Sequence, residues 1–235
     1  MRWILLPGMD GVGLFSQFIE ALGPDQDFLV LSYPTNLPLS YDQLTTLVRE
    51  SLQDETDYIL IAESFSGPIA IRLATERPPG LRALILAASF CRSPVVGLSA
   101  ILLSKIGVSL FRVRPPLRAV KYFLLGNGAS KQLIDEFYTA IGLVSIKTLA
   151  FRLKEILKVN ACNCCADILV PTLYIQANKD RLVGPQEAQV IGHAVADFDL
   201  HQIDAPHMVL QRQPALSYLA IRDFLISHKI LTTEL

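Results

Sequence analysis

The apolar residues of this 235-residue chain fall into two alternating kinds of segment. Short unbroken apolar runs predict buried strands of a parallel sheet, because such strands are covered on both faces. Between the runs, apolar residues recur at the three- and four-residue spacing of amphipathic helices. The alternation predicts an α/β fold with a mostly parallel sheet of about six strands and helices on both faces. We expect strands at residues 3–6, 28–32, 58–62, 81–87, 172–176 and 199–203, and helices at residues 14–22, 40–53, 68–76, 186–194 and 214–228.

The alternation breaks between the fourth and fifth predicted strands. Residues 89–167 show helical patterns interrupted by glycine and proline clusters, with no further strand pattern. We therefore divide the chain into a core, residues 1–88 and 168–235, and a helical lid insertion, residues 89–167. One insertion within a core of this size is better described as a lid than as an independent domain.

Composition narrows the class of protein. Half of the residues are apolar (51%), 18% are charged and the mean hydropathy is +0.38, which excludes a mainly disordered chain. A net charge of −1 without a basic tail argues against nucleic acid as a partner.

The apolar run at residues 3–6 is too short for a signal peptide. The stretch 95–110 contains Lys105 and falls short of the roughly 20 apolar residues of a membrane span. We expect no transmembrane segment.

Four cysteines are present, at positions 91, 162, 164 and 165. The tight group at 162–165 lacks a second Cys or His pair at the spacing of a zinc site. We therefore expect no metal, and four reduced thiols in a protein of the cytoplasm.

The turn after the third predicted strand holds a candidate nucleophile. Ser64 lies between a strand and a helix in Ala62-Glu63-Ser64-Phe65-Ser66, with a small residue two positions away on each side. This is the pattern of a nucleophile elbow, in which small neighbours let the backbone turn sharply. Ser66 is a rival, although Pro68 crowds the position two residues beyond it. A plain helix N-cap is the other interpretation of Ser64.

A base and an acid follow later strands. His207 lies in the loop after the last predicted strand, and Asp180 lies in the loop after the fifth. The chain order serine, aspartate, histidine is the order of the catalytic residues in this type of architecture. The carboxylate of Asp180 would hold the tautomer of His207 and stabilise the imidazolium. Asp204 is the competing acid, only three residues before the histidine.

An oxyanion formed at Ser64 also needs two backbone N–H donors. One is expected from Phe65, the residue after the nucleophile. The other is expected from Met9, because the adjacent Gly8 lets the backbone of the first loop come close. The glycines at 8–13 could also be interpreted as a phosphate loop, but the Gly-Lys-Ser/Thr ending of such loops is missing.

Taken together, these four motifs resemble the α/β-hydrolase superfamily over almost the whole chain: Pro7-Gly8-Met9-Asp10-Gly11, the segment 62–67, Ala177-Asn178-Lys179-Asp180 and Ala205-Pro206-His207. The resemblance implies a serine hydrolase that cleaves a carboxylic ester or thioester through an acyl-enzyme on Ser64, with no cofactor. Pro7 stands where many members have histidine, and the leading antiparallel hairpin of the family is missing. A cofactor-free lyase or peroxidase, or a non-catalytic ligand-binding protein of this fold, are the alternatives.

The predicted lid offers the one clue to the substrate. No acidic residue occurs between Ser89 and Ile134, while seven basic residues do: Arg92, Lys105, Arg112, Arg114, Arg118, Lys121 and Lys131. A solvated basic face is one interpretation. The other is a surface for an anionic partner, such as an acyl carrier protein, an acyl-CoA or an anionic lipid surface.

Overall fold

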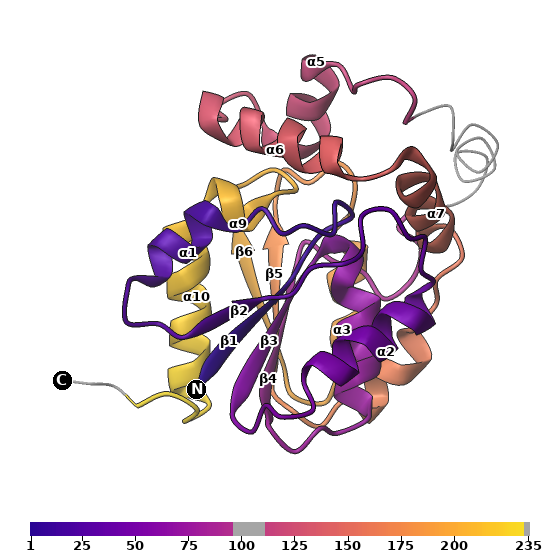
Figure 1. Ribbon diagram of the computed structural model, residues 1–235. Coiled ribbons are helices and arrows are strands. Elements are labelled where there is room, and N and C mark those ends of the chain that lie inside the picture. Colours follow the sequence, from indigo (N-terminus) through magenta and orange to yellow (C-terminus); the bar gives the residue numbers. More distant parts are fainter. Residues whose placement is uncertain (96–110, 233–235) are drawn as a thin grey trace.

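The computed structural model describes residues 1–95 and 111–232. Within these ranges six strands form one sheet in the order β2-β1-β3-β4-β5-β6, and every neighbouring pair is parallel (Figure 1). The predicted parallel sheet of about six strands is confirmed. The strands are β1 (Arg2–Leu6), β2 (Phe28–Val30), β3 (Tyr58–Glu63), β4 (Leu81–Ala87), β5 (Thr172–Ala177) and β6 (Phe198–Ile203).

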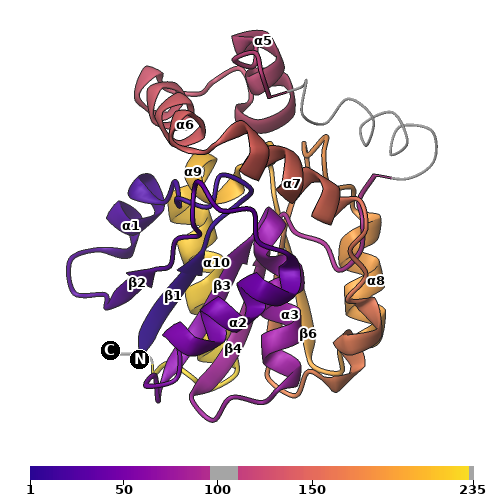
Figure 2. The same cartoon turned by 45° about the vertical axis from the view of Figure 1, so that its right-hand side comes forward.

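Helices cover both faces of the sheet (Figures 1 and 2). Successive strand side chains point to opposite faces, so Trp3 and Leu5 join one hydrophobic core and Ile4 and Leu6 join the other. One face packs against α1 (Ser16–Leu22), α9 (Val209–Arg212) and α10 (Pro214–Ser227). The other face packs against α2 (Tyr41–Ser51), α3 (Gly67–Thr75) and α8 (Gln186–Ala194).

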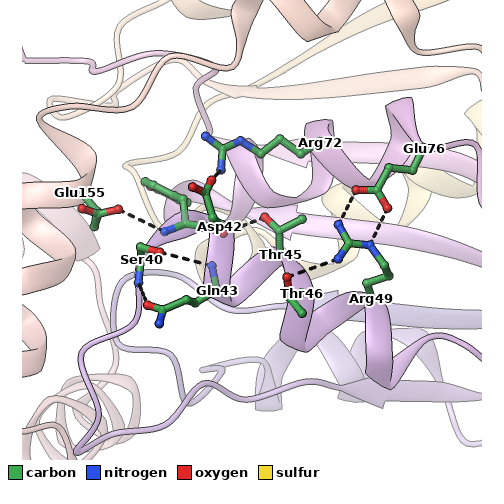
Figure 3. Close-up of polar contacts among 10 residues, drawn as sticks. Ser40, Asp42, Gln43, Thr45, Thr46, Arg49, Arg72, Glu76 and Glu155 are labelled. Atoms are coloured by element: carbon green, nitrogen blue, oxygen red, sulfur yellow. Dashed lines mark hydrogen bonds and ion pairs between the residues drawn. The ribbon is translucent and has the colours of Figure 1, made fainter.

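Helices α2 and α3 are joined by polar contacts (Figure 3). At the start of α2, the Ser40 hydroxyl accepts from the Gln43 N–H while the Gln43 side chain accepts from the Ser40 N–H, a capping box. Two ion pairs, Asp42 with Arg72 and Glu76 with Arg49, connect the two helices. The residues of these pairs are largely exposed, so each pair adds little stability.

The regular elements that the structure describes within residues 89–167, between β4 and β5, are helices. They are α5 (Leu117–Val120), η2 (Lys121–Leu125), α6 (Lys131–Leu143), α7 (Ile146–Ile156) and η3 (Cys162–Asp167). Helices α5, α6 and α7 lie beyond the carboxyl ends of the strands (Figures 1 and 2). We call residues 89–167 the β4–β5 segment.

The β4–β5 segment has a small hydrophobic core of its own. Buried side chains of α5, η2 and α6 pack there against Leu14, which precedes α1, and Met208, which follows His207. The predicted apolar stretch 95–110 and Lys105 lie, apart from residue 95, outside the described residues. Within residues 1–95 and 111–232, no helix is long and apolar enough to cross a membrane.

The expectation of four reduced cysteines is wrong for two of them. Cys91, after β4, and Cys162, at the start of η3, form a disulfide, while Cys164 and Cys165 are free. The two partners are 71 positions apart and meet because the β4–β5 segment leaves the sheet and returns at the same place. Spacing along the chain carries no information about such a pairing. The cytoplasmic location, which rested partly on these thiols, stays a prediction.

The two ends of the β4–β5 segment run side by side next to this disulfide. The Cα atoms of Cys91 and Cys162 are 4.9 Å apart. The Ala161 N–H donates to the carbonyl oxygen of Cys91 over 2.7 Å, and Arg92 and Asn160 form an antiparallel bridge. The segment therefore leaves and re-enters the core through a narrow neck.

Candidate functional site

Ser64 occupies a strained turn between β3 and α3. Its φ angle is +48°, in the left-handed region that residues with a side chain rarely adopt. The turn is pressed against the end of β4: Ser89 donates a hydrogen bond of 2.6 Å to the carbonyl oxygen of Ser64, and a Cβ at Gly67 would overlap the Ser89 hydroxyl. Glycine at position 67 is what lets the two strand ends approach so closely.

The structure brings Ser64, His207 and Asp180 together. Nε2 of His207 lies 2.8 Å from Oγ of Ser64, and Nδ1 lies 2.7 Å from Oδ2 of Asp180. Asp180 is itself held in place, because its Oδ1 accepts from the N–H groups of Leu182 and Val183 at 2.8 and 3.0 Å. The carboxylate can therefore accept Nδ1–H, which leaves Nε2 free to accept the proton of the serine.

Asp204, the competing acid, lies elsewhere. Its carboxylate forms an exposed ion pair with Lys179, 2.7 Å away. The side chains of Asp180 and His207 are by contrast only 3% and 7% exposed. The structure thus pairs the histidine with Asp180.

Opposing effects set the pKa of His207. Burial lowers it, while the charge of Asp180, its hydrogen bond and the charge of Glu63 raise it. The net result is a pKa above the ordinary value of 6.5. The site therefore favours the protonated form of this imidazole.

Phe65 is held by its ring and by the carbonyl groups on both sides of its Cα. Its ring is buried and stacks on Tyr41, with ring centres 4.8 Å apart, and its carbonyl oxygen accepts from the Tyr41 hydroxyl. On the other side of the residue, the carbonyl of Ser64 accepts from Ser89 and from the Gly67 N–H. In a trans peptide the N–H points opposite to the carbonyl, so the Phe65 N–H points away from these partners.

Met9 lies in a tight turn after β1. The Gly8 carbonyl accepts from the Gly11 N–H over 3.0 Å. The carboxylate of Asp10 accepts from the N–H groups of the two residues after Gly11. Among the described residues, the N–H groups of Gly8, Met9 and Asp10 have no hydrogen-bond partner. The turn thus keeps donors available at the place where the sequence predicts one.

Ser66, the rival nucleophile, has a different position. Its side chain is completely buried, accepts from the Tyr33 hydroxyl over 2.6 Å and donates to the carbonyl oxygen of Pro7. A hydroxyl with both partners inside the protein is not available to a substrate. Ser66 instead joins the turn that carries Ser64 to the loop that carries Met9.

Sequence reasoning missed Glu63, the residue before Ser64. Its carboxyl is buried, and Oε2 accepts a hydrogen bond of 3.1 Å from Gln211 of α9. Burial raises the pKa of Glu63 to about 7, the charge of Asp10 adds to the rise, and Gln211 and His207 oppose it. The sequence signal was an acid at the end of an otherwise apolar strand.

A shallow groove of about 730 Å³ opens nearby but does not contain these residues. It runs between residues 12–16 and helix α6. Ser64, Asp180 and His207 do not line it. Glu136 of α6 lines it and accepts hydrogen bonds from Ser16 and Gln17 of α1. No group of three or more metal-binding side chains occurs within the part of the chain that the structure describes.

A serine on a strand-to-helix elbow, with aspartate and histidine on the loops after β5 and β6 of a parallel sheet, defines the α/β-hydrolase fold. Comparison with solved structures agrees. The chain superposes on a hydrolase from Oleispira antarctica with a TM-score of 0.80 and 16% identity, covering 95% of this chain and 90% of the other. For the enol-lactonase from Burkholderia xenovorans LB400 the TM-score is 0.75 and the identity 15%, with 95% and 90% covered.

A third solved structure, a lipase-esterase related protein from Clostridium acetobutylicum ATCC 824, gives a TM-score of 0.76 at 14% identity, covering 95% of this chain and 93% of the other. No protein-family model matches the sequence, and a sequence search of curated proteins finds no match. At such low identity the likeness shows the fold, and the fold is the α/β-hydrolase fold.

Proposed function

We propose that the protein is a serine hydrolase that cleaves a carboxylic ester or thioester through an acyl-enzyme on Ser64. The observation that carries the proposal is the hydrogen-bonded chain from Ser64 through His207 to Asp180, with separations of 2.8 and 2.7 Å. An enol-lactonase and a lipase-esterase related protein share the fold, and both names denote ester chemistry.

The reaction would run in two halves. Oγ of Ser64 attacks the carbonyl carbon while Nε2 of His207 takes its proton, and the N–H groups of Phe65 and Met9 hold the oxyanion. His207 then gives the proton to the departing alcohol or thiol, leaving the acyl group on Ser64. Water attacks the acyl-enzyme with the same histidine as base, and the acid is released. Asp180 stabilises the imidazolium in both halves.

Hydrolysis of short p-nitrophenyl esters tests this proposal. We expect turnover by the wild type, loss of turnover in Ser64→Ala and His207→Ala, and labelling of Ser64 by a fluorophosphonate probe, located by peptide mass spectrometry. Wild-type rates in either variant would refute the assignment. Identification of the reaction products separates an esterase from a lyase or a peroxidase that uses the same three residues. A protein that is neither labelled nor active would indicate a non-catalytic binding protein.

The charge and surface of the β4–β5 segment support a proposal for the substrate. Val113 and Tyr122 are exposed apolar side chains. The exposed Arg112 is adjacent to Val113, and the exposed Arg118 precedes Tyr122 by four residues. Arg181, from the core, stacks on the ring of Tyr122 at 4.0 Å. We infer that this segment acts as a lid that receives an anionic acyl carrier, either coenzyme A or an acyl carrier protein.

Charge reversal tests the acyl-carrier proposal. In Arg112→Glu/Arg118→Glu we expect a higher KM for an acyl-CoA and an unchanged KM for a neutral p-nitrophenyl ester. Lys154→Glu/Lys158→Glu changes the charge by the same amount at exposed positions of the same segment and serves as the control. An equal change of KM for both substrates would contradict the proposal.

A further inference from the structure

Arg152 of α7 is a buried cation that binds backbone carbonyls of the core. It is 1% exposed. Its Nη1 donates to the carbonyl oxygens of Met9 and Asp10 at 2.9 and 2.8 Å, and its Nη2 donates to that of Pro34 at 3.0 Å. A guanidinium suits this role because its donors lie in one rigid plane and can serve several acceptors at once.

These bonds act on both peptide groups that follow Met9. Arg152 holds the Met9–Asp10 and Asp10–Gly11 peptides through their carbonyl oxygens. The preceding peptide is held by the bond from the Gly11 N–H to the Gly8 carbonyl. Met9 therefore lies between peptide planes that are fixed on both sides. The direction of its N–H depends on the guanidinium as well as on the turn itself.

The loop is shaped to admit this guanidinium. Gly11 has a φ of +71°, and a Cβ at this position would collide with the end of the Arg152 side chain. Among the described residues, no carboxylate forms an ion pair with Arg152. Burial lowers the pKa of Arg152, and the nearby charge of Asp10 opposes that change. The group remains a cation at neutral pH, and the loop's carbonyl dipoles are its main partners.

Helix α7 is docked on the core at two further points, which places Arg152. The Ser145 N–H, just before the helix, donates to the Thr35 carbonyl over 2.8 Å. Near its other end, Glu155 accepts from the N–H of Tyr41 at the start of α2 over 3.1 Å (Figure 3). A substitution at Glu155 therefore disturbs the docking of α7 without changing a contact of the Met9 loop.

We propose that Arg152 is a positioning residue that orients the Met9 N–H toward the oxyanion, so that a side chain of the β4–β5 segment completes a site otherwise built by the sheet loops. This inference rests on the proposed ester cleavage. It assigns no contact between Arg152 and the substrate. Its effect is expected on the transition state, where negative charge develops on the carbonyl oxygen, and hence on kcat more than on KM.

The test compares an oxygen ester with its thionoester, in which sulfur, a poor hydrogen-bond acceptor, replaces the carbonyl oxygen. Both substrates are measured with Arg152→Met, which removes the charge, and with Arg152→Lys, which keeps it. We expect kcat for the oxygen ester to fall by at least about tenfold, and by no more than the roughly 100- to 1000-fold that complete loss of an oxyanion donor costs. KM should change less than about twofold, and the preference for oxygen over sulfur should shrink.

Two controls make the outcome specific. Glu155→Ala removes the acceptor of the Tyr41 N–H, so it loosens the docking of α7 and should keep the wild-type preference for oxygen over sulfur. Free guanidinium added to Arg152→Ala should restore part of kcat. A folded Arg152 variant that loses activity equally on both substrates would overturn the inference and leave the proposed function intact. A wild-type protein that cleaves neither substrate would overturn both.

Discussion

The hydroxyl of Ser66 donates a hydrogen bond to the carbonyl oxygen of Pro7, and so fastens the turn that carries Ser64 to the loop that carries Met9. The same hydroxyl accepts from Tyr33. The two backbone segments that would together bind an oxyanion are thus connected by one buried side chain. Their separation is set by this contact as well as by the pairing of β1 with β3.

Replacing Ser66 should therefore weaken the protein without abolishing its activity. Ser66→Ala leaves the Pro7 carbonyl and the Tyr33 hydroxyl without this partner, and we expect about 1–3 kcal/mol less stability in urea unfolding and a reduced kcat. Tyr33→Phe is the control, since it keeps the bond between Ser66 and Pro7 and should retain kcat. Complete loss of fluorophosphonate labelling at Ser64 in a folded Ser66→Ala would contradict this view.

The pH profile of ester cleavage should report His207. The imidazole must be neutral to accept the serine proton, and its pKa lies above 6.5, so kcat/KM should rise with pH and level off above that raised pKa. In Asp180→Asn the charge that raises the pKa is gone. The midpoint should move to lower pH, and the plateau should fall by up to about 10⁴-fold because the tautomer is no longer held. A midpoint that stays in place or moves upward would show that Asp180 does not act on His207.

Glu63 should make stability depend on pH. Its pKa is about 7 in the folded chain and has an ordinary value of 4.5, so folding takes up a proton between these values. Stability is then lost as pH rises from 4.5 to 7, and the full cost, on the order of 3 kcal/mol, is present above pH 7. Glu63→Gln should remove this slope. Urea unfolding from pH 4 to 9 checks it, and parallel curves for the two proteins would disprove it.

The Cys91–Cys162 bond should account for much of the stability. Closing a loop of this length restricts the unfolded chain by about 4 kcal/mol in the chain-entropy description. We expect that loss in Cys91→Ser/Cys162→Ser, and the same loss when the wild type is reduced. Cys164→Ser, which changes a free thiol, should leave stability nearly unchanged. Unfolding that does not respond to reductant would rule the bond out as a source of stability.

Much of the fold followed from local pattern. The runs that predict β1 and β3–β5 end within one residue of the observed strands, because a strand covered on both faces must be largely apolar. The edge strand β6 also ends within one residue of its predicted bounds, although most of its side chains are exposed. Chain order alone then put Ser64, Asp180 and His207 on three loops at the same edge of a parallel sheet. The hydrogen bonds among these three residues depend on side-chain packing, and packing cannot be predicted from the order of the motifs.

What the sequence did not reveal are contacts between distant positions. Arg152 lies 143 residues from Met9, and its position on the apolar face of α7, three residues after Leu149, was the only hint that it is buried. Cys91 and Cys162 likewise carry no sign of their pairing. Ser66 was weighed only as a rival nucleophile, since a sequence shows that a hydroxyl is present and not what it binds.

The neck at Cys91 and Cys162 allows the residues between these two cysteines to be exchanged as a unit. Because the Cα atoms of Cys91 and Cys162 lie 4.9 Å apart, a shorter or longer stretch could replace the residues between them without moving β4 or η3. Exchange of these residues would test the proposal that this segment selects the substrate. If Arg152 positions the Met9 N–H as proposed, any replacement must again bring a cation to the carbonyls of Met9 and Asp10.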